Sequence, residues 1–293
     1  MTLLQNIITG ISVGGLYSLY ALGIAVVYGV AGIINFAHGY FIAFAAYVLL
    51  ALAGVPVLVA IVCALAAGIA IAVATERGVF RFARGADPGT LLVLAFAVAL
   101  AIKSLLTLVA GSDTVSTSFG SELAKPLQIG SLSIVWIDLV TIVVAGVMLA
   151  GLALLLNRTP VGVQLRAAAE DFTMARLVGV RSNRVMMVAF AVSGLLAGAG
   201  GLLLVARSGT LTPTSGLQPV LIAFVAVVIG GLGSLPGAVA GGFLLGGTTV
   251  ALQVLLPEEI RPYRDAILYT LVIVILTFRP QGLLPSANER SRV

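Results

Sequence analysis

The segment Asn157 to Arg184, NRTPVGVQLRAAAEDFTMARLVGVRSNR, is a polar interruption between two long apolar runs. Its acidic residues are Glu170 and Asp171, and they are outnumbered by five arginines. Positively charged loops of membrane proteins stay in the cytoplasm, so we expect this segment there. Its position then sets the orientation of the apolar runs on either side. The arginines are Arg158, Arg166, Arg176, Arg181 and Arg184.

The interior of this segment, Val163 to Leu177, has no proline or glycine and is rich in alanine, leucine and arginine, which predicts a short helix. Thr159 and Pro160 suit the start of the helix, and Gly179 suits its end as the C′ residue. Small apolar residues form one face and charged residues the other. An exposed helix of this kind is suited to docking a partner. The alternative is a loop helix that lies on the bilayer with its arginine heads reaching the headgroups.

The composition places the chain among polytopic membrane proteins. Hydrophobic residues make up 60% of it and charged residues only 9%, and the mean hydropathy is +1.17, far from the balance of a soluble domain. The net charge of +5 does not point to nucleic acid, because the arginines cluster at the ends of apolar runs, where membrane topology explains them. The single cysteine, Cys63, lies inside an apolar run and reads as a small hydrophobic residue.

Apolar runs alternate with polar segments along the chain and predict an all-α protein with eight to ten spans, some of them broken. Three basic segments are expected inside the cell, and they hold eleven of the sixteen Lys and Arg residues. The amino terminus is then outside if residues 3–74 cross three times, and inside if they cross two or four times. The apolar runs are 3–30, 40–53, 55–74, 91–110, 136–156, 185–206, 219–255 and 266–278, and the basic segments are 76–88, 157–184 and 279–292.

Two apolar runs lead into glycine-rich breaks. Residues 25–29, AVVYG, are followed by Gly32, and residues 226–230, AVVIG, are followed by Gly233. Paired interrupted helices in two halves of a transporter are typical of a solute path near the middle of the membrane. The alternative is a coincidence in a chain of few residue types.

The polar residues of the first break, Asn35 and His38, are candidates for the substrate path, because polar side chains within spans usually face a cavity or another helix. An amino acid could use the amide and the imidazole as hydrogen-bond partners. The alternative is that Asn35 caps the helix after it and that His38 bonds a backbone carbonyl. We add the small residues of the two breaks to the same path, with backbone geometry and close helix approach as their role: Gly39, Gly231, Gly233 and Ser234.

Other chemistry is not indicated. The two lysines, Lys103 and Lys125, do not stand in a Gly-Lys-Ser/Thr motif, so the chain lacks the sequence of a phosphate-binding loop. No His, Cys, Asp and Glu cluster has metal-ligand spacing, and no nucleophile stands near a base in the sequence. We therefore expect no catalytic residues, no metal and no cofactor. Lys103 could pair with Asp138 on the neighbouring span or extend to the interface.

Four motifs carry a family resemblance, and they occur in order across nearly the whole chain. They are INFAHG at 34–39, RAAAEDFTMARLVGV at 166–180, VIGGLGSLPGAVAGG at 228–242 and FRPQGLLP at 278–285. With them the chain resembles the permeases of branched-chain amino-acid ABC importers, the LivH type. Permeases for urea and short amides share these motifs and are the alternative substrate assignment, while an ion-coupled secondary transporter is a more distant one.

The resemblance implies one permease domain over residues 1–293, with 157–184 as its cytoplasmic coupling loop, in a bacterial inner membrane. It also implies a second, LivM-like permease, two cytoplasmic ATPases that bind the ATP, and a periplasmic binding protein. For the contact with an ATPase we expect Ala168, Ala169 and Leu177 to pack into a groove of the partner. Arg166, Glu170 and Asp171 would form the charged rim, and Gly179 would end the helix.

Overall fold

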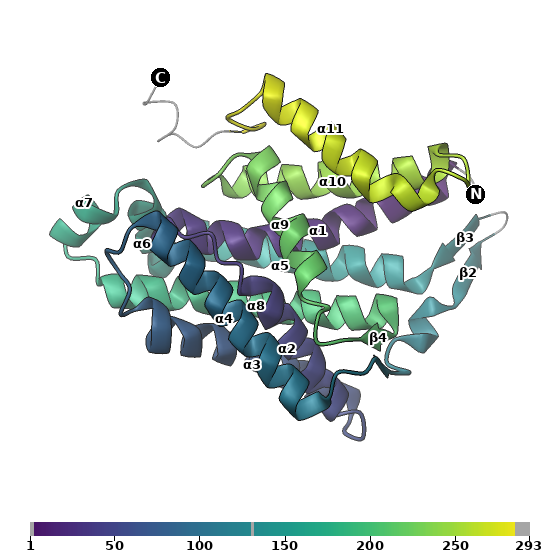
Figure 1. Ribbon diagram of the computed structural model, residues 1–293, viewed down its shortest axis with the longest axis horizontal. Coiled ribbons are helices and arrows are strands. Elements are labelled where there is room, and N and C mark those ends of the chain that lie inside the picture. Colours follow the sequence, from purple (N-terminus) through teal and green to yellow (C-terminus); the bar gives the residue numbers. More distant parts are fainter. Residues whose placement is uncertain (1–2, 130–131, 285–293) are drawn as a thin grey trace.

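The computed structural model describes residues 3–129 and 132–284 and is a bundle of helices (Figure 1). Six helical segments in these ranges are long and apolar enough to cross a membrane, which confirms an all-α polytopic membrane protein. Three shorter helices lie among them, and the expected number of eight to ten spans stays a prediction, because the described residues contain six helices of spanning length. The long ones are α1 (Leu3–Ala31), α3 with its π-helical extension η1 (Val57–Thr75 and Glu76–Phe80), α4 (Pro88–Ala110), α5 (Trp136–Arg158), α8 (Ser182–Ser208) and α10 (Leu235–Leu255); the shorter ones are α2 (His38–Ala51), α9 (Leu217–Gly230) and α11 (Arg264–Phe278).

The remaining elements lie at the two ends of the bundle (Figure 1). One end carries two short antiparallel strand pairs, and we call it the hairpin end; the other carries α6 and α7, and we call it the α6–α7 end. Strands β1, β2 and β3 fall in the polar stretch between α4 and α5, and β4 follows α8. The elements are α6 (Pro160–Glu170), α7 (Phe172–Leu177), β1 (Val115–Ser116) paired with β4 (Thr210–Leu211), β2 (Pro126–Ile129) paired with β3 (Leu132–Val135), and the 3₁₀ turns Ser121–Ala124 and Arg261–Tyr263.

The helix predicted over 163–177 is in fact two helices. Its start is as expected, because the Thr159 hydroxyl accepts a hydrogen bond from the Gly162 N–H at 3.0 Å and Pro160 is the first helical residue. The prediction of one continuous helix was wrong at Asp171, whose carboxylate accepts a bond from the Met174 N–H at 2.9 Å and caps a second helix. Asp side chains compete with the helix for backbone N–H groups in this way, which summed propensity does not register.

The end of α7 follows the prediction. Gly179 has φ +92°, a value that glycine adopts without a steric penalty. The N–H of Val180 bonds the Ala175 carbonyl at 3.0 Å, and that of Gly179 bonds the Arg176 carbonyl at 3.1 Å. These two bonds form a Schellman motif, which fixes the chain direction out of α7.

The two halves of the bundle pack in the same way. Helix α1 lies against α8, α9 and α10, and α8 lies against α1, α2 and α3. In the seam between α1 and α10, a Cβ atom at Gly246 would lie within 2.8 Å of the Val13 carbonyl carbon and closer still to the Gly14 backbone. In the seam between α3 and α8, a Cβ atom at Gly194 would lie 2.8 Å from the Ala72 Cβ. Small residues four apart, Gly194 and Gly198 on α8 and Gly242 and Gly246 on α10, therefore bring the backbones together in both seams.

In the two similarly packed halves, α1 corresponds to α8 and α2 corresponds to α9. The sequence similarity between residues 25–29 and 226–230 suggested a different repeat. The echo falls at the carboxyl ends of α1 and α9, and positive-φ glycines follow both: Gly32 at +66°, and Gly231 and Gly233 at +110° and +78°. The first break lies between a long and a short helix, and the second between a short and a long one. The similarity therefore reflects the same way of ending a helix at two non-equivalent places.

The carboxyl-terminal segment after α11 closes over the second break. The N–H groups of Leu283 and Leu284 donate to the carbonyls of Ile229 and Gly230 at 2.7 and 2.9 Å. These carbonyls belong to the last turn of α9, where a helix leaves its C=O groups without partners. Two of the four family-like motifs thus contact each other. The last residue of the 278–285 motif, Pro285, lies outside the described residues.

Candidate functional site

The first break places a polar centre at the middle depth of the bundle. His38 is fully buried, and its Nδ1 lies 3.0 Å from the hydroxyl of Ser193, a residue near the middle of α8. Its ring occupies the space that the missing side chain of Gly23 leaves on α1, since a Cβ there would lie within 2.9 Å of the ring nitrogen Nδ1. The imidazole therefore joins α2 to both long helices, and its partner is a hydroxyl and not the backbone carbonyl that the alternative required.

Asn35 is also fully buried, and its Oδ1 accepts a bond from the Ala37 N–H at 3.1 Å. This bond spans two residues, so it forms a local turn before α2 and only in part resembles the expected cap. Two polar atoms of the centre, Asn35 Nδ2 and His38 Nε2, have no hydrogen-bond partner in the described part of the chain. Unpaired buried polar atoms are costly, so these two are available to water or a solute.

The short helices α2 and α9 meet beside this centre. A Cβ atom at Gly216, just before α9, would lie 2.5 Å from the Gly39 carbonyl oxygen, and a Cβ at Gly39 would strike Val220 at 2.6 Å. Both helices begin at this crossing. From it α2 runs toward the hairpin end, and α9 runs mainly across the bundle toward α10 and α11 (Figure 1). Gly39 thus lets α2 and α9 approach each other closely, which is the role that we expected of the small residues in the path.

The second group of expected path residues lies elsewhere. Gly231 lies at the end of α9, where a Cβ at Gly282 would come within 2.6 Å of its backbone nitrogen. Ser234 caps α10 by accepting from the Gly237 N–H at 3.1 Å, and Gly233 supplies the positive φ before it. Gly231 lies against the carboxyl-terminal segment, whereas His38 contacts α1 and α8. The structure does not bring the two groups into one site.

Helices α6 and α7 expose part of the surface that we expected to dock a partner. Ala168 is only 3% exposed and faces the bundle, while Ala169 lies near Gly29 at the end of α1. Leu177 is 76% exposed, and Glu170 and Asp171 are exposed beside it. Arg166 is exposed and bonds the Asn157 side chain at 3.0 Å. The outward apolar surface consists of Val163, Met174, Leu177 and Val178.

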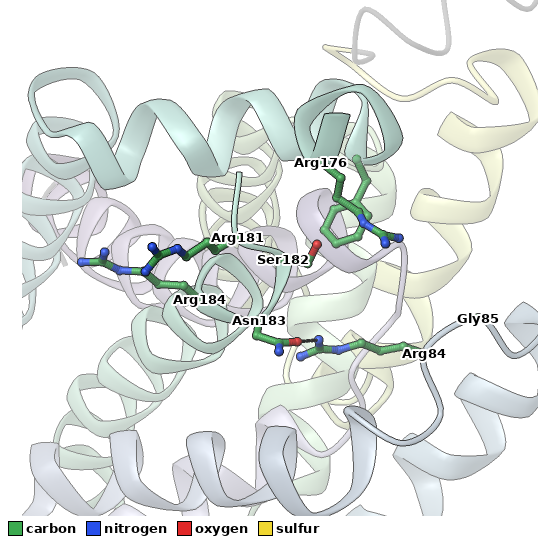
Figure 2. Close-up of a pocket in the computed structure, with 8 residues that line it drawn as sticks. Arg84, Gly85, Arg176, Arg181, Ser182, Asn183 and Arg184 are labelled. Carbon is green, nitrogen blue, oxygen red and sulfur yellow. Dashed lines mark hydrogen bonds between the residues drawn. The ribbon is translucent and has the colours of Figure 1, made fainter. Parts of the chain in front are cut away.

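A basic cleft of about 860 Å³ lies between α7, the start of α8 and the turn before α4 (Figure 2). Arg84, in that turn, bonds Glu76 and Asn183, and Glu76 is 2% exposed. The other three guanidinium groups form no ion pair with the described residues. The cleft therefore carries net positive charge at the α6–α7 end. Its three other arginines are Arg176, Arg181 and Arg184.

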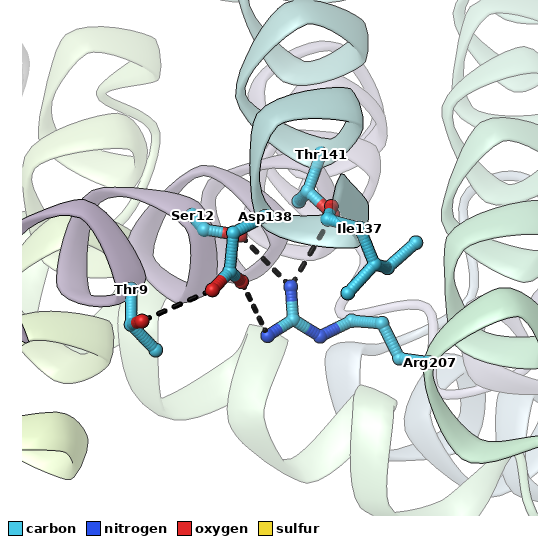
Figure 3. Close-up of polar contacts among 6 residues, drawn as sticks. All are labelled: Thr9, Ser12, Ile137, Asp138, Thr141 and Arg207. Atoms are coloured by element: carbon cyan, nitrogen blue, oxygen red, sulfur yellow. Dashed lines mark hydrogen bonds and ion pairs between the residues drawn. The ribbon is translucent and has the colours of Figure 1, made fainter. Parts of the chain in front are cut away.

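Near the hairpin end, Arg207 of α8 connects three helices (Figure 3). Its guanidinium donates to Asp138 of α5 at 3.1 Å, to Ser12 of α1 at 2.8 Å and to Thr141 at 3.2 Å. The second carboxylate oxygen of Asp138 accepts from the Thr9 hydroxyl at 3.0 Å. Charged groups inside a span are stable when paired in this way. Asp138 thus pairs with Arg207 and not with Lys103.

Arg207 was not among the predicted site residues, although its position in the sequence carries a signal. It follows the apolar run 185–206 at the end that charge distribution assigns to the outside, where positive residues are disfavoured. A cation on the wrong side of a span needs a local partner. Asp138 was the obvious one, because it stands in the first turn of another helix at the same end.

Comparison with known proteins decides the family. The family described as "Branched-chain amino acid transport system / permease component" matches residues 6–276. The chain belongs to this family. In this permease family, the protein BraD of Pseudomonas aeruginosa, named as a high-affinity branched-chain amino acid transport system permease, is 33% identical over 96% of this chain and 95% of its own length. The permease LivH of Escherichia coli strain K12 is 30% identical over the same shares.

A third relative extends the family to a different kind of permease. LivM of Escherichia coli strain K12, also named as a branched-chain amino acid permease, is 30% identical over 47% of this chain and 32% of its own length. Two distinct permeases that are similar to this chain, one over most of its length and one over about half, therefore occur in one organism.

Proposed function

We propose that this protein is the permease subunit of an ABC importer that carries branched-chain amino acids across a bacterial inner membrane. The observation that carries the proposal is the family match over residues 6–276, together with relatives named for this transport that align with 96% of the chain. In the proposed complex the chain works with a LivM-like permease, two cytoplasmic ATPases and a periplasmic binding protein. ATP is bound by the ATPases, because this sequence lacks a phosphate-binding loop motif.

The docking surface for an ATPase is the outward face of α6 and α7. Its support is an exposed apolar group, Val163, Met174, Leu177 and Val178, next to the charges of Arg166, Glu170 and Asp171. Ala168 is buried within this chain, so the contact is made by its neighbours instead. Clusters of apolar residues with a charged rim are typical of protein interfaces, and the basic cleft beside α7 would favour a partner that is acidic there.

Movement of the docked helices would pass to the polar centre through α1. Helix α6 packs on the end of α1, and α1 holds the His38 ring at Gly23. A shift of α6 therefore moves the element against which α2 begins. In the proposed alternating access, this shift opens and closes the crossing of α2 and α9 at Gly39 and Gly216.

Counting α1, α2 and α3 as three passages within residues 3–74, we infer that the amino terminus lies outside and the α6–α7 end inside. This assignment agrees with the basic segments 76–88 and 157–184, which lie at the α6–α7 end. Cysteine labelling of a Thr2→Cys and a Thr173→Cys variant by a membrane-impermeant reagent tests it. After Cys63 is replaced by alanine, only the Thr2→Cys variant should react from the periplasmic side.

Uptake of labelled solutes tests the function, in cells with and without this gene and with the neighbouring transport genes intact. The panel contains leucine, valine, glutamate, urea and acetamide. Loss of leucine and valine uptake alone supports the proposal. Loss of urea or acetamide uptake instead would overturn the substrate and leave the architecture, and uptake that persists without ATP under a proton gradient would overturn the ABC mechanism.

The docking claim has its own test. Reversing both charges in the Glu170→Arg, Asp171→Arg double variant is expected to abolish ATP-driven uptake and to release the ATPases from purified complex, while the permease still inserts. Arg158→Glu, a charge reversal at the same end but outside the outward face of α6 and α7, is the control and should retain the complex. Normal uptake by the double variant would contradict the docking surface.

A further inference from the structure

A small groove lies beside the Arg207 network, between α1, α8 and α9. Its volume is about 220 Å³, which suits one small solute. Five residues with polar groups line it: Tyr17 and Tyr20 of α1, Arg207 and Ser208 of α8, and Gln218 of α9. Apolar surface completes it, with Leu16, Leu204 and Ile222. The groove therefore has a charged part and an aliphatic part, and a branched-chain amino acid likewise has charged groups at one end and an aliphatic side chain at the other.

We propose that this groove binds the transported amino acid, with Arg207 holding the α-carboxylate and the leucine and isoleucine side chains receiving the aliphatic group. This inference rests on the proposed function and goes beyond it, because it names a substrate site that none of the four family-like motifs contains.

Arg207 is arranged to hold an anion. Its two terminal nitrogens are fixed by Asp138, Ser12 and Thr141, and its Nε has no hydrogen-bond partner in the described part of the chain. The side chain is 23% exposed, compared with 7% for Asp138, so the carboxylate lies behind the guanidinium. A guanidinium held in place loses little conformational entropy when it binds, and it offers hydrogen bonds of fixed direction to a carboxylate.

The groove must meet water or another protein and not lipid. Arg207 is partly exposed there, and Gln218 is exposed with no hydrogen-bond partner in residues 3–129 and 132–284. A charged group or an amide group that faces hydrocarbon is strongly disfavoured unless it is paired. Polar groups at this position are therefore expected on the solute path or at the junction with the second permease.

Two further features suit an amino acid. The hydroxyl of Tyr20 is buried and has no partner in the described residues, so its oxygen can accept a hydrogen bond from an α-ammonium group. Helix α9 begins at Leu217, so Gln218 and Pro219 bring its amino-terminal end into the groove. The positive end of the α9 dipole adds to the charge of Arg207 in favouring a carboxylate.

The groove also lies in a suitable place along the path. Gln218 is two residues beyond Gly216, where α9 crosses α2, and Arg207 stands in the last turn of α8 toward the hairpin end. A solute that arrives from the outside would meet Arg207 first. The site would then hold the amino acid beside the crossing at Gly39 and Gly216.

Photolabelling of the purified complex tests this site. The complex contains this permease, the second permease and both ATPases, is reconstituted in nanodiscs, and is irradiated with a diazirine analogue of leucine, after which the modified residues are mapped by mass spectrometry. We expect labels on the α1, α8 and α9 peptides that line the groove, reduced by excess leucine and unaffected by leucinamide, which lacks the carboxylate. Labels confined to peptides around Asn35 and His38, or equal competition by leucinamide, would overturn the inference.

Two tyrosine variants separate binding from folding. Tyr20→Phe removes a hydroxyl that has no hydrogen-bond partner among the described residues, so it should leave the fold intact and reduce labelling about 2- to 10-fold, the value of one hydrogen bond. Tyr47→Phe is the control, since the Tyr47 hydroxyl is likewise buried and has no partner within residues 3–129 and 132–284, but it lies outside the groove. Equal labelling of the two variants would overturn the inference.

Leucine uptake by the same complex in proteoliposomes with the binding protein separates the two proposals. Uptake without labelling of the groove means that the inference fails and the proposed function stands. Absence of leucine uptake by the wild-type complex means that the proposed function itself fails.

Discussion

Replacement of Gly246 by alanine is expected to separate α10 from α1. The new Cβ would lie within 2.8 Å of the Val13 carbonyl carbon and closer still to the backbone of Gly14. Carbon atoms in contact are normally about 3.5–4.0 Å apart, so the helices must move apart by about 1 Å. Insertion of a methyl group into a packed seam costs about 1–3 kcal/mol, and the better helix propensity of alanine returns at most about 1 kcal/mol.

The adjacent residue provides the control. A Cβ atom at Gly247 would meet no atom within 4 Å, so Gly247→Ala keeps the propensity gain without the clash. We expect its stability to be unchanged or slightly higher, while Gly246→Ala loses up to about 2 kcal/mol after the full propensity gain is subtracted. The comparison of the two variants thus separates the effect of the clash with α1 from the effect of replacing glycine by alanine in a helix.

Thermal unfolding of the purified permease in detergent measures the difference. A dye that fluoresces on reaction with thiols reports unfolding through Cys63, the single cysteine, which is half-buried. Gly246→Ala should unfold several degrees below the wild type and Gly247→Ala at or above it. Equal midpoints for the two variants would refute the reasoning, because the seam would then tolerate a methyl group on either side.

Three further predictions concern the ends of the bundle. Asp138→Asn leaves Arg207 without its ion-pair partner and should lower the free energy of unfolding by about 1–3 kcal/mol. Glu122→Gln breaks an exposed pair with Lys125 and should change the free energy of unfolding by less than about 1 kcal/mol. The same dye assay compares the two variants. Gly282→Ala should detach the carboxyl-terminal segment from α9, because Gly282 has φ +77° and no room for a Cβ, and faster trypsin cleavage after Arg279 is the expected sign. Asp171→Ala removes the cap of α7, worth about 1 kcal/mol, and should speed amide hydrogen exchange in 172–177 while exchange in α6 stays unchanged.

The long helices could be predicted from the sequence because each apolar run is long enough to cross a membrane. The ends of these helices were also readable where a single residue type decides the backbone, as at Thr159 and Gly179. The break at Asp171 could not be read from propensity, since the residues around it all favour a helix and the interruption comes from one carboxylate.

The candidate sites were predicted less completely, because they depend on which helices become neighbours. His38 and Asn35 stood out as polar residues in an apolar chain, yet the partner of His38, Ser193, comes from a helix 155 residues later. Ala168 was expected outside on the basis of its small size, and the same small size lets it pack inside. In the sequence, Arg207 only follows an apolar run, and its partners on α1 and α5 become evident only in the folded bundle.

The meeting of α2 and α9 at their starts has a consequence for leakage. Two half-helices that begin at one depth place the positive ends of their dipoles together there. Neither helix contains an acidic residue to cancel this potential. Oriented half-helices of this kind repel cations in water-filled pores. An importer of this design can open its crossing to a solute, and sodium ions and protons that drive other processes in the same membrane still meet an electrostatic barrier at that point.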